Sequence, residues 1–152
     1  MTRSVIVTGA ARGLGLGIAQ RLFSDGWAVA LVDQSADVVQ VAESLDQTGA
    51  RARGLVLDVS DPQASVDTVN SVAAQFPDLT GLVNNAGIGG PSTAVHHTDP
   101  AAFRRVLDVN LLGPFHMVRA AFPHMFGHGR GASIVNITSI LGQQAAAGTG
   151  PY

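Results

Sequence analysis

The stretch "TGAARGLG", residues 8–15, decides the expected fold of this sequence. It follows a short apolar run at 4–8 and opens a segment in which Leu14, Ile18 and Leu22 recur every four residues, as on one face of a helix. Backbone N–H groups at such a strand-to-helix turn, together with the helix dipole, can bind a pyrophosphate. The spacing G-x-x-x-G-x-G differs from the common dinucleotide fingerprint G-x-G-x-x-G, and a purely structural glycine turn is the alternative.

Each glycine of this turn has its own expected role in holding a dinucleotide. Gly9 would permit the sharp turn, Gly13 the close approach of a phosphate, and Gly15 the tight packing of helix on strand. Arg12 and Leu14 lie between these glycines and are included as candidate cofactor contacts.

Asp33 is the expected partner of this turn, because it lies just past the second apolar run, eighteen residues after Gly15. A carboxylate there can accept hydrogen bonds from both hydroxyls of an adenosine ribose and would repel a 2′-phosphate. Arg12 argues the other way, since a guanidinium could pair with that phosphate. We favour NAD as the cofactor over NADP, because Asp33 occupies the ribose position itself; a solvated aspartate that caps the next helix is the alternative.

Short runs rich in Val, Ile and Leu alternate with segments of helical spacing along the chain. The runs are expected as strands at 4–8, 27–32, 53–59, 81–87 and 133–137. Further helices are expected to open at Ser35, at Asp61-Pro62 and at Asp99-Pro100, where a capping side chain precedes the first turn. This order predicts a doubly wound (Rossmann) parallel α/β sheet, incomplete at its C-terminal side, with residues 1–152 as the N-terminal portion of a single dinucleotide-binding domain.

Composition excludes several classes of function. The chain has 152 residues, of which 46% are hydrophobic and 13% charged, and its nine basic residues are all arginine against eleven acidic ones. A net charge of −2 without a basic cluster argues against nucleic-acid binding. The absence of cysteine fits a reducing, cytoplasmic location, and no apolar stretch approaches the ~20 residues that span a bilayer, so no membrane association is expected.

An ordered set of motifs resembles the short-chain dehydrogenase/reductase family. The set comprises "TGAARGLG", "LDV" at 57–59, "NNAG" at 84–87, "VN" at 109–110, "TS" at 138–139 and Tyr152. The resemblance implies that Asp58 and Val59 contact the adenine, and that Asn85, Ala86 and Gly87 line the cofactor cleft. Asp58 as a strand end, and the asparagines as satisfied turn residues, are the structural alternatives.

The resemblance also implies an active site made of Asn110, Ser139, Tyr152 and a lysine four residues after the tyrosine. In that mechanism hydride passes between the nicotinamide cofactor and a small-molecule alcohol or carbonyl substrate while the tyrosine hydroxyl exchanges a proton with it. Ser139 would hydrogen-bond the substrate oxygen. A tyrosine pKa near 10 must be lowered by about three units, which nearby positive charge supplies. A homo-oligomer, dimer or tetramer, is expected for the complete protein.

Pro114 permits an inference from the residues themselves. If 109–117 is helical, the proline has no N–H for the carbonyl of Asn110, four residues earlier, and that oxygen is left for another partner. The helix is expected to kink there. A simple break between two helices is the alternative.

The sequence stops at Tyr152, and it contains no lysine. We therefore expect a truncated chain that lacks dehydrogenase activity, in which the apolar strand 133–137 forms an uncovered edge. A non-catalytic dinucleotide-binding module and an inert truncation product are the alternative functions. His124 and His128, four residues apart, are interpreted as helix-end residues, so no metal site is expected.

Overall fold

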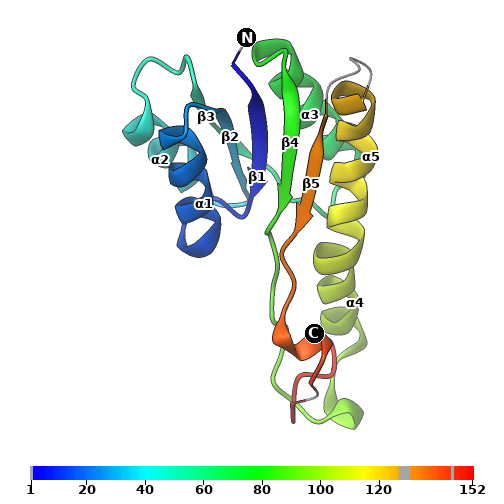
Figure 1. Ribbon diagram of the computed structural model, residues 1–152. Helices are drawn as coiled ribbons and strands as arrows, with labels where there is room; N and C mark the ends of the chain where they lie inside the picture. Colours follow the sequence, from blue (N-terminus) through cyan, green and yellow to red (C-terminus); the bar gives the residue numbers. More distant parts are fainter. Residues whose placement is uncertain (1, 127–130, 145) are drawn as a thin grey trace.

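The computed structural model describes residues 2–126, 131–144 and 146–152. Strands and helices alternate through these residues: β1 (Ser4–Thr8), α1 (Gly13–Ser24), β2 (Ala28–Asp33), α2 (Asp37–Leu45), β3 (Ala52–Val56), α3 (Pro62–Gln75), β4 (Leu79–Asn84), α4 (Pro100–Leu107), α5 (Gly113–Phe126) and β5 (Ser133–Asn136). All described strand pairs are parallel, in the order β3-β2-β1-β4-β5 (Figure 1). The predicted doubly wound parallel sheet is confirmed.

Helices cover both faces of the sheet, and the strands are apolar on both faces for that reason. In β1, Val5 and Val7 pack with Ala19 of α1 and with residues of α2. Ile6, which points to the other face, packs in a second cluster with Val69 of α3 and with residues of α5. The near-continuous runs of Val, Ile and Leu in the sequence therefore reflect burial on two sides.

The order of the strands reverses between β1 and β4. From β1 the chain moves outward to β2 and β3, and it then returns to the other side of β1 to form β4 and β5 (Figure 1). The connections after β1 and after β4 leave toward opposite faces of the sheet, so a crevice opens between the carboxyl ends of these two strands. This crevice is where a ligand is expected to bind in an open α/β sheet.

Aspartate caps fix the start of two helices. The Asp61 carboxylate accepts hydrogen bonds from the backbone N–H groups of Gln63 and Ala64, both at 2.9 Å. Asp99 accepts one from Ala102 at 3.1 Å. The predicted helix starts at Pro62 and Pro100 are confirmed. The second helix does not start at Ser35 as predicted: α2 begins at Asp37, and its cap residue is Ala36.

A π-helical turn, Asp108–Leu112, joins α4 to α5. Its end is marked by the N–H of Gly113, which donates to the carbonyl of Asp108 five residues earlier. Helical structure through Pro114 is thus confirmed, but the sequence did not indicate the five-residue step. Because that step changes which carbonyl faces the proline, the release of the Asn110 carbonyl and the kink stay predictions.

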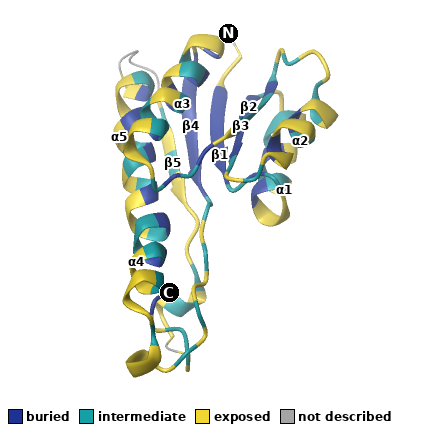
Figure 2. Ribbon diagram, turned by 180° about the vertical axis from the view of Figure 1, so that it is seen from behind, coloured by how far each residue is buried: buried dark blue, intermediate teal, exposed yellow. Residues whose placement is uncertain are grey.

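The β5 edge carries exposed apolar side chains. Val135 is 47% exposed, and Figure 2 shows much of this strand in the colour of exposed residues. The expectation of an uncovered apolar edge is confirmed for the described chain. Phe103, on α4, is 36% exposed. None of the described helices is both long and apolar enough to cross a membrane.

Candidate functional site

The turn after β1 places glycine where no other residue fits. Gly9 and Gly13 have positive φ angles of 65° and 59°. A Cβ on Gly9 would lie 2.9 Å from the Ala86 Cα, and one on Gly15 would overlap the Gly9 carbonyl oxygen. A Cβ on Gly13 would meet nothing within 4 Å, so the backbone there faces open space. This geometry is compatible with the sharp turn expected at Gly9 and the tight packing of helix on strand expected at Gly15, and the close approach of a phosphate at Gly13 stays a prediction.

The N-terminus of α1 has no side-chain cap. Its cap residue, Arg12, is extended, with φ −161°, and contributes no hydrogen bond from its side chain to the helix. Leu14, the second residue of the helix, is 61% exposed. The first N–H groups of α1 are thus left for a ligand, and the helix dipole favours an anion there.

Asp33 binds the glycine turn directly. Its Oδ2 accepts a hydrogen bond from the Ala11 N–H at 3.0 Å, and its Oδ1 accepts one from the Ser35 N–H at 3.0 Å. The carboxylate therefore lies beside the glycine turn at the end of β2, as the sequence predicted. The interpretation as a mere cap of α2 is not supported, because the cap position belongs to Ala36.

Thr8 joins the ends of β1 and β4. Its hydroxyl donates to the Val83 carbonyl at 3.3 Å and accepts from the N–H groups of Asn85 and Ala86, both at 3.0 Å. The Asn85 side chain returns two hydrogen bonds to the first turn, to the carbonyls of Thr8 and Gly9 at 2.9 and 3.2 Å. Because the threonine binds these N–H groups, β4 ends at Asn84, and the expected strand 81–87 was too long.

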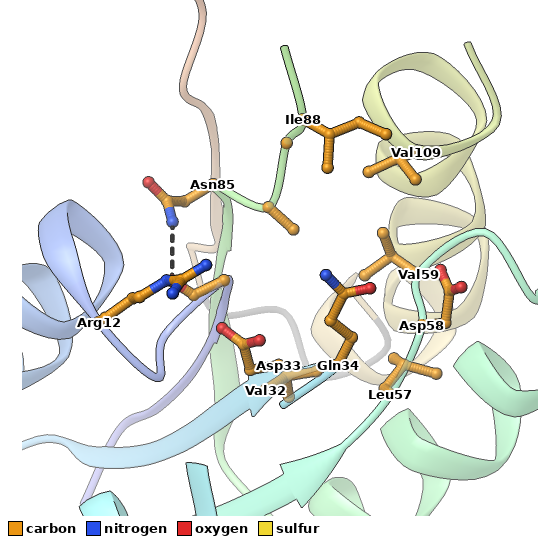
Figure 3. Close-up of a pocket in the computed structure, with 13 residues that line it drawn as sticks. Arg12, Val32, Asp33, Gln34, Leu57, Asp58, Val59, Asn85, Ile88 and Val109 are labelled. Atoms are coloured by element: carbon orange, nitrogen blue, oxygen red, sulfur yellow. Dashed lines mark hydrogen bonds between the residues drawn. The ribbon is translucent and has the colours of Figure 1, made fainter. Parts of the chain in front are cut away.

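These elements enclose a first cavity of about 160 Å³. Most of the predicted cofactor contacts line it: Gly9, Arg12, Asp33, Asp58, Val59, Asn85, Ala86 and Gly87. Figure 3 shows Arg12 and Asp33 at one side of this cavity and Leu57, Asp58 and Val59 at another, with Ile88 and Val109 opposite Asp33. Gly13, Leu14 and Gly15 are not among the lining residues; they form the helix start beside it.

Asp58 is held by three hydrogen bonds. Its Oδ1 accepts from the N–H and the hydroxyl of Ser60 at 3.0 and 2.7 Å, and its Oδ2 accepts from the Arg105 guanidinium at 2.6 Å. Burial raises the pKa of Asp58, but the hydrogen bonds from Ser60 and Arg105 outweigh burial and leave the pKa below its ordinary value. The group therefore stays a carboxylate at neutral pH.

The Asn110 side chain clamps the loop that follows β4. Its Oδ1 accepts from the Ile88 N–H and its Nδ2 donates to the Ile88 carbonyl, both at 2.9 Å. Both groups of the amide are thus used in a contact across 22 positions of sequence, so of its polar groups only the backbone carbonyl could serve another partner, as expected from Pro114. The next loop residue inward, Gly87, would bring a Cβ within 3.4 Å of Asn110.

A second, larger cavity of about 810 Å³ lies on the other side of this loop. Its walls include all three predicted catalytic residues, Asn110, Ser139 and Tyr152. The Ser139 hydroxyl accepts from the Leu141 N–H at 3.2 Å, which leaves its proton available to a ligand. Tyr152 is 48% exposed. Residues 85–88 line both cavities, so the two cavities share one wall.

Among the described residues, no group of three or more His, Cys, Asp or Glu side chains could hold a metal ion. His124 forms a 2.8 Å contact with the Asn70 side chain. His128 lies outside the described residues.

Several residues of the site were missed in the sequence. Thr8 was quoted as part of the turn but not recognised as the link between two strands. The cavity walls add Val32, Gln34 and Ile88, which lie next to predicted site residues, and Leu57 and Val109, which were quoted within the motifs at 57–59 and 109–110 but given no role. No sequence pattern indicates a role for Arg105, because its partner Asp58 lies 47 positions away.

Comparison with known proteins agrees with the motif order. The sequence profile described as short chain dehydrogenase matches residues 3–152. The cis-4-hydroxycyclohexanecarboxylate dehydrogenase of Sinomonas cyclohexanicum is 39% identical over 150 residues, covering 99% of this chain and 60% of that protein. The crystal structure of NAD⁺-bound xylitol dehydrogenase matches with a TM-score of 0.91 and 33% identity, over 99% of this chain and 58% of the other.

A metagenomic short-chain oxidoreductase in complex with NADP matches with a TM-score of 0.90 and 32% identity, over 99% of this chain and 68% of the other. The chain thus spans about 60% of the length of the curated relatives with which it aligns. Because the family match runs from residue 3 to residue 152 and the fold agrees with solved members, the chain belongs to the short-chain dehydrogenase family.

Proposed function

We propose that this chain carries the cofactor site and the catalytic tyrosine of an oxidoreductase that transfers hydride between NAD and an alcohol or carbonyl substrate. The observation that supports this most strongly is the gathering of Asn110, Ser139 and Tyr152 on one cavity that shares the wall 85–88 with the dinucleotide crevice. The relatives named above, dehydrogenases of a hydroxycyclohexanecarboxylate and of xylitol, support an alcohol as the substrate class.

The residues present fit a nicotinamide dinucleotide. The uncapped start of α1 and the positive-φ Gly9 and Gly13 suit a pyrophosphate, and Asp33 suits a ribose diol. When bound, the nicotinamide supplies the hydride acceptor or donor of the reaction. Gly87 and Ile88, on the shared wall, would border its reactive ring.

The chain's own groups would manage the substrate oxygen. Tyr152 would exchange a proton with that oxygen through its hydroxyl, and Ser139 would donate a hydrogen bond to it. Such a tyrosine needs positive charge nearby, because its ordinary pKa is about 10. No lysine occurs in these 152 residues, so they do not contain the lysine of the family's active site.

Activity and catalytic role can be tested together. We expect the 152-residue chain alone to show no turnover with a panel of secondary alcohols and NAD. In the full-length protein, Tyr152→Phe should abolish turnover. Its NADH affinity should stay within about twofold of that of the unaltered protein, because the phenol hydroxyl acts on the substrate. Turnover by the short chain would contradict its expected inactivity, and full activity of the phenylalanine variant would contradict the catalytic role of Tyr152. A non-catalytic module would bind NADH and show no turnover in any form.

The proposed preference for NAD rests on Asp33. A carboxylate bound to the Ala11 N–H would repel a 2′-phosphate, whereas Arg12, on the same cavity, could attract one. We expect fluorescence titration to give an affinity for NADH at least tenfold above that for NADPH. Asp33→Asn should narrow this ratio, and an equal or tighter binding of NADPH by the unaltered protein would refute the preference.

We further propose that the protein is cytoplasmic, as its lack of cysteine supports, and that it forms a homo-oligomer. The α5 helix leaves Phe115, Phe122 and Phe126 exposed, and the last two rings stack with centroids 4.5 Å apart. These positions lie on one side of a helix, a pattern that suits a helical face of a second copy. Sedimentation of the full-length protein tests this, and Phe122→Lys should dissociate the oligomer.

A further inference from the structure

One ion pair joins a residue that lines the dinucleotide cavity to helix α4, which lies outside it. Arg105 comes from α4, and its guanidinium donates to the Asp58 Oδ2 at 2.6 Å and to the Ser60 hydroxyl at 2.5 Å. Asp58 belongs to the segment that follows β3 and lines the cavity. Nothing in the expected chemistry of the reaction requires this arginine, so its place beside a cavity residue calls for an explanation.

The ion pair contributes little to stability by itself. The Arg105 and Asp58 side chains are 41% and 42% exposed, and exposed pairs of this kind are weak because water screens them. Its geometry is nevertheless well defined. The guanidinium forks onto two partners, and Ser60, the second of them, itself donates to the Asp58 Oδ1 at 2.7 Å. This closed set of hydrogen bonds fixes the direction of the carboxylate.

These hydrogen bonds limit how many further donors the Asp58 carboxylate can accept from. A carboxylate has about four acceptor positions, two on each oxygen. Ser60 occupies both positions of Oδ1 through its N–H and its hydroxyl, and Arg105 occupies one position of Oδ2. One acceptor position on Oδ2 remains for a ligand. Because the pKa of Asp58 is lowered, this position belongs to an ionised oxygen that needs a donor.

We propose that Arg105 is a positioning residue, which turns the remaining acceptor of Asp58 toward the exocyclic amino group of the adenine in the bound dinucleotide. An adenine presents a donor at this amino group, whereas hypoxanthine carries an acceptor oxygen at the same place. Arg105 thereby sets the preference of the cavity for adenine. This inference rests on the proposed function as a dinucleotide enzyme.

The position of Arg105 in α4 supports this role. The helix runs directly into the π turn, where Val109 lines the same cavity on the side of Val59 and Asp58 (Figure 3). The neighbouring Asn110 clamps Ile88, which lines it as well. The ion pair therefore holds the segment after β3 against α4 and the π turn, so an adenine in the cavity meets Asp58 and Val109 in a fixed arrangement.

The test compares NADH with reduced nicotinamide hypoxanthine dinucleotide, which has a carbonyl oxygen in place of this amino group and a proton on the neighbouring ring nitrogen N1, and which carries the same fluorescent nicotinamide. We expect the full-length protein to bind NADH about tenfold more tightly, or ~1.4 kcal/mol. In Arg105→Met the ratio should fall to within about twofold, because the carboxylate is no longer oriented. Arg105→Lys should also lose most of the preference, since an ammonium cannot fork onto both partners.

Arg104→Met is the matched control, because Arg104 is the adjacent arginine of α4 and is exposed. It should keep the tenfold ratio. Circular dichroism confirms that the variants fold, as the exposure of Arg105 leads us to expect. The inference is overturned if Arg105→Met or Arg105→Lys keeps the full ratio, if both dinucleotides weaken equally, or if the unaltered protein has no preference. Failure of the unaltered protein to bind either dinucleotide would instead overturn the proposed function.

Discussion

Replacement of Gly15 by alanine tests the packing of α1 on the glycine turn after β1. The new Cβ would overlap the Gly9 carbonyl oxygen and lie 2.5 Å from the Asn85 Nδ2. Both are parts of the site that cannot rotate away, because one is backbone and the other is held by hydrogen bonds to Thr8 and Gly9. The helix must therefore move away from the turn.

The expected magnitude follows from two opposing effects. Overpacking of this kind costs about 1–3 kcal/mol or more. Alanine in a helix gains up to about 1 kcal/mol over glycine, which offsets only part of that cost. We expect the free energy of unfolding to fall by about 1–2 kcal/mol. We also expect at least tenfold weaker NADH binding, the loss of about one hydrogen bond to a charged group.

Gly17→Ala is the matched control in the same helix. A Cβ at Gly17 would meet nothing within 4 Å, so alanine should leave the protein as stable or up to about 1 kcal/mol more stable, with unchanged NADH affinity. Urea unfolding and NADH fluorescence titration measure both quantities. If the two variants have equal stability and equal affinity, the proposed contact between α1 and the turn is wrong.

Three further predictions concern other parts of the fold. Asp61→Ala removes the two hydrogen bonds that cap α3 and should lower the free energy of unfolding by about 1 kcal/mol in urea titration. Asp67→Ala is the control, because Asp67 lies inside α3 and does not cap it, and it should lower the free energy of unfolding by less. Asn110→Ala leaves the Ile88 N–H and carbonyl without their partner and should destabilise the protein by about 1–3 kcal/mol, a loss that thermal unfolding detects. The pKa of Asp46 is lowered to about 2 from 3.8, above all by the hydrogen bond from the Thr48 side chain. Its contribution to stability is therefore complete above pH 4 and is lost as the pH falls toward 2. Urea titrations at pH 5 and pH 3 should show a smaller fall in the free energy of unfolding for Asp46→Asn than for the unaltered protein.

The sequence predicted the strands and two helix starts because their causes are local. A parallel sheet covered on both faces requires continuous runs of Val, Ile and Leu, and such runs are visible without the structure. Asp61-Pro62 and Asp99-Pro100 likewise combine a cap with a residue suited to the first helical turn. Asp33 could be assigned because the end of β2 always lies near the turn after β1 in this fold.

The remaining features depend on contacts between distant parts of the chain. The π turn at Asp108–Leu112 has ordinary helical composition, so its five-residue step leaves no trace in the spacing of apolar residues. The early end of β4 results from the Thr8 hydroxyl, which acts across 77 positions. The ion pair of Arg105 with Asp58 depends on how α4 lies against the loop after β3, and two exposed charges in a sequence do not indicate each other.

The loop formed by residues 85–88 is a partition between two chambers and has one side in each. Thr8 anchors its beginning and Asn110 its end, so it is neither a hinge nor a free flap. Any ligand that displaces this partition from one chamber changes the volume available in the other. By thermodynamic linkage the effect is then mutual. If a ligand in the first chamber changes the affinity of the second chamber by some factor, a ligand in the second changes the affinity of the first by the same factor.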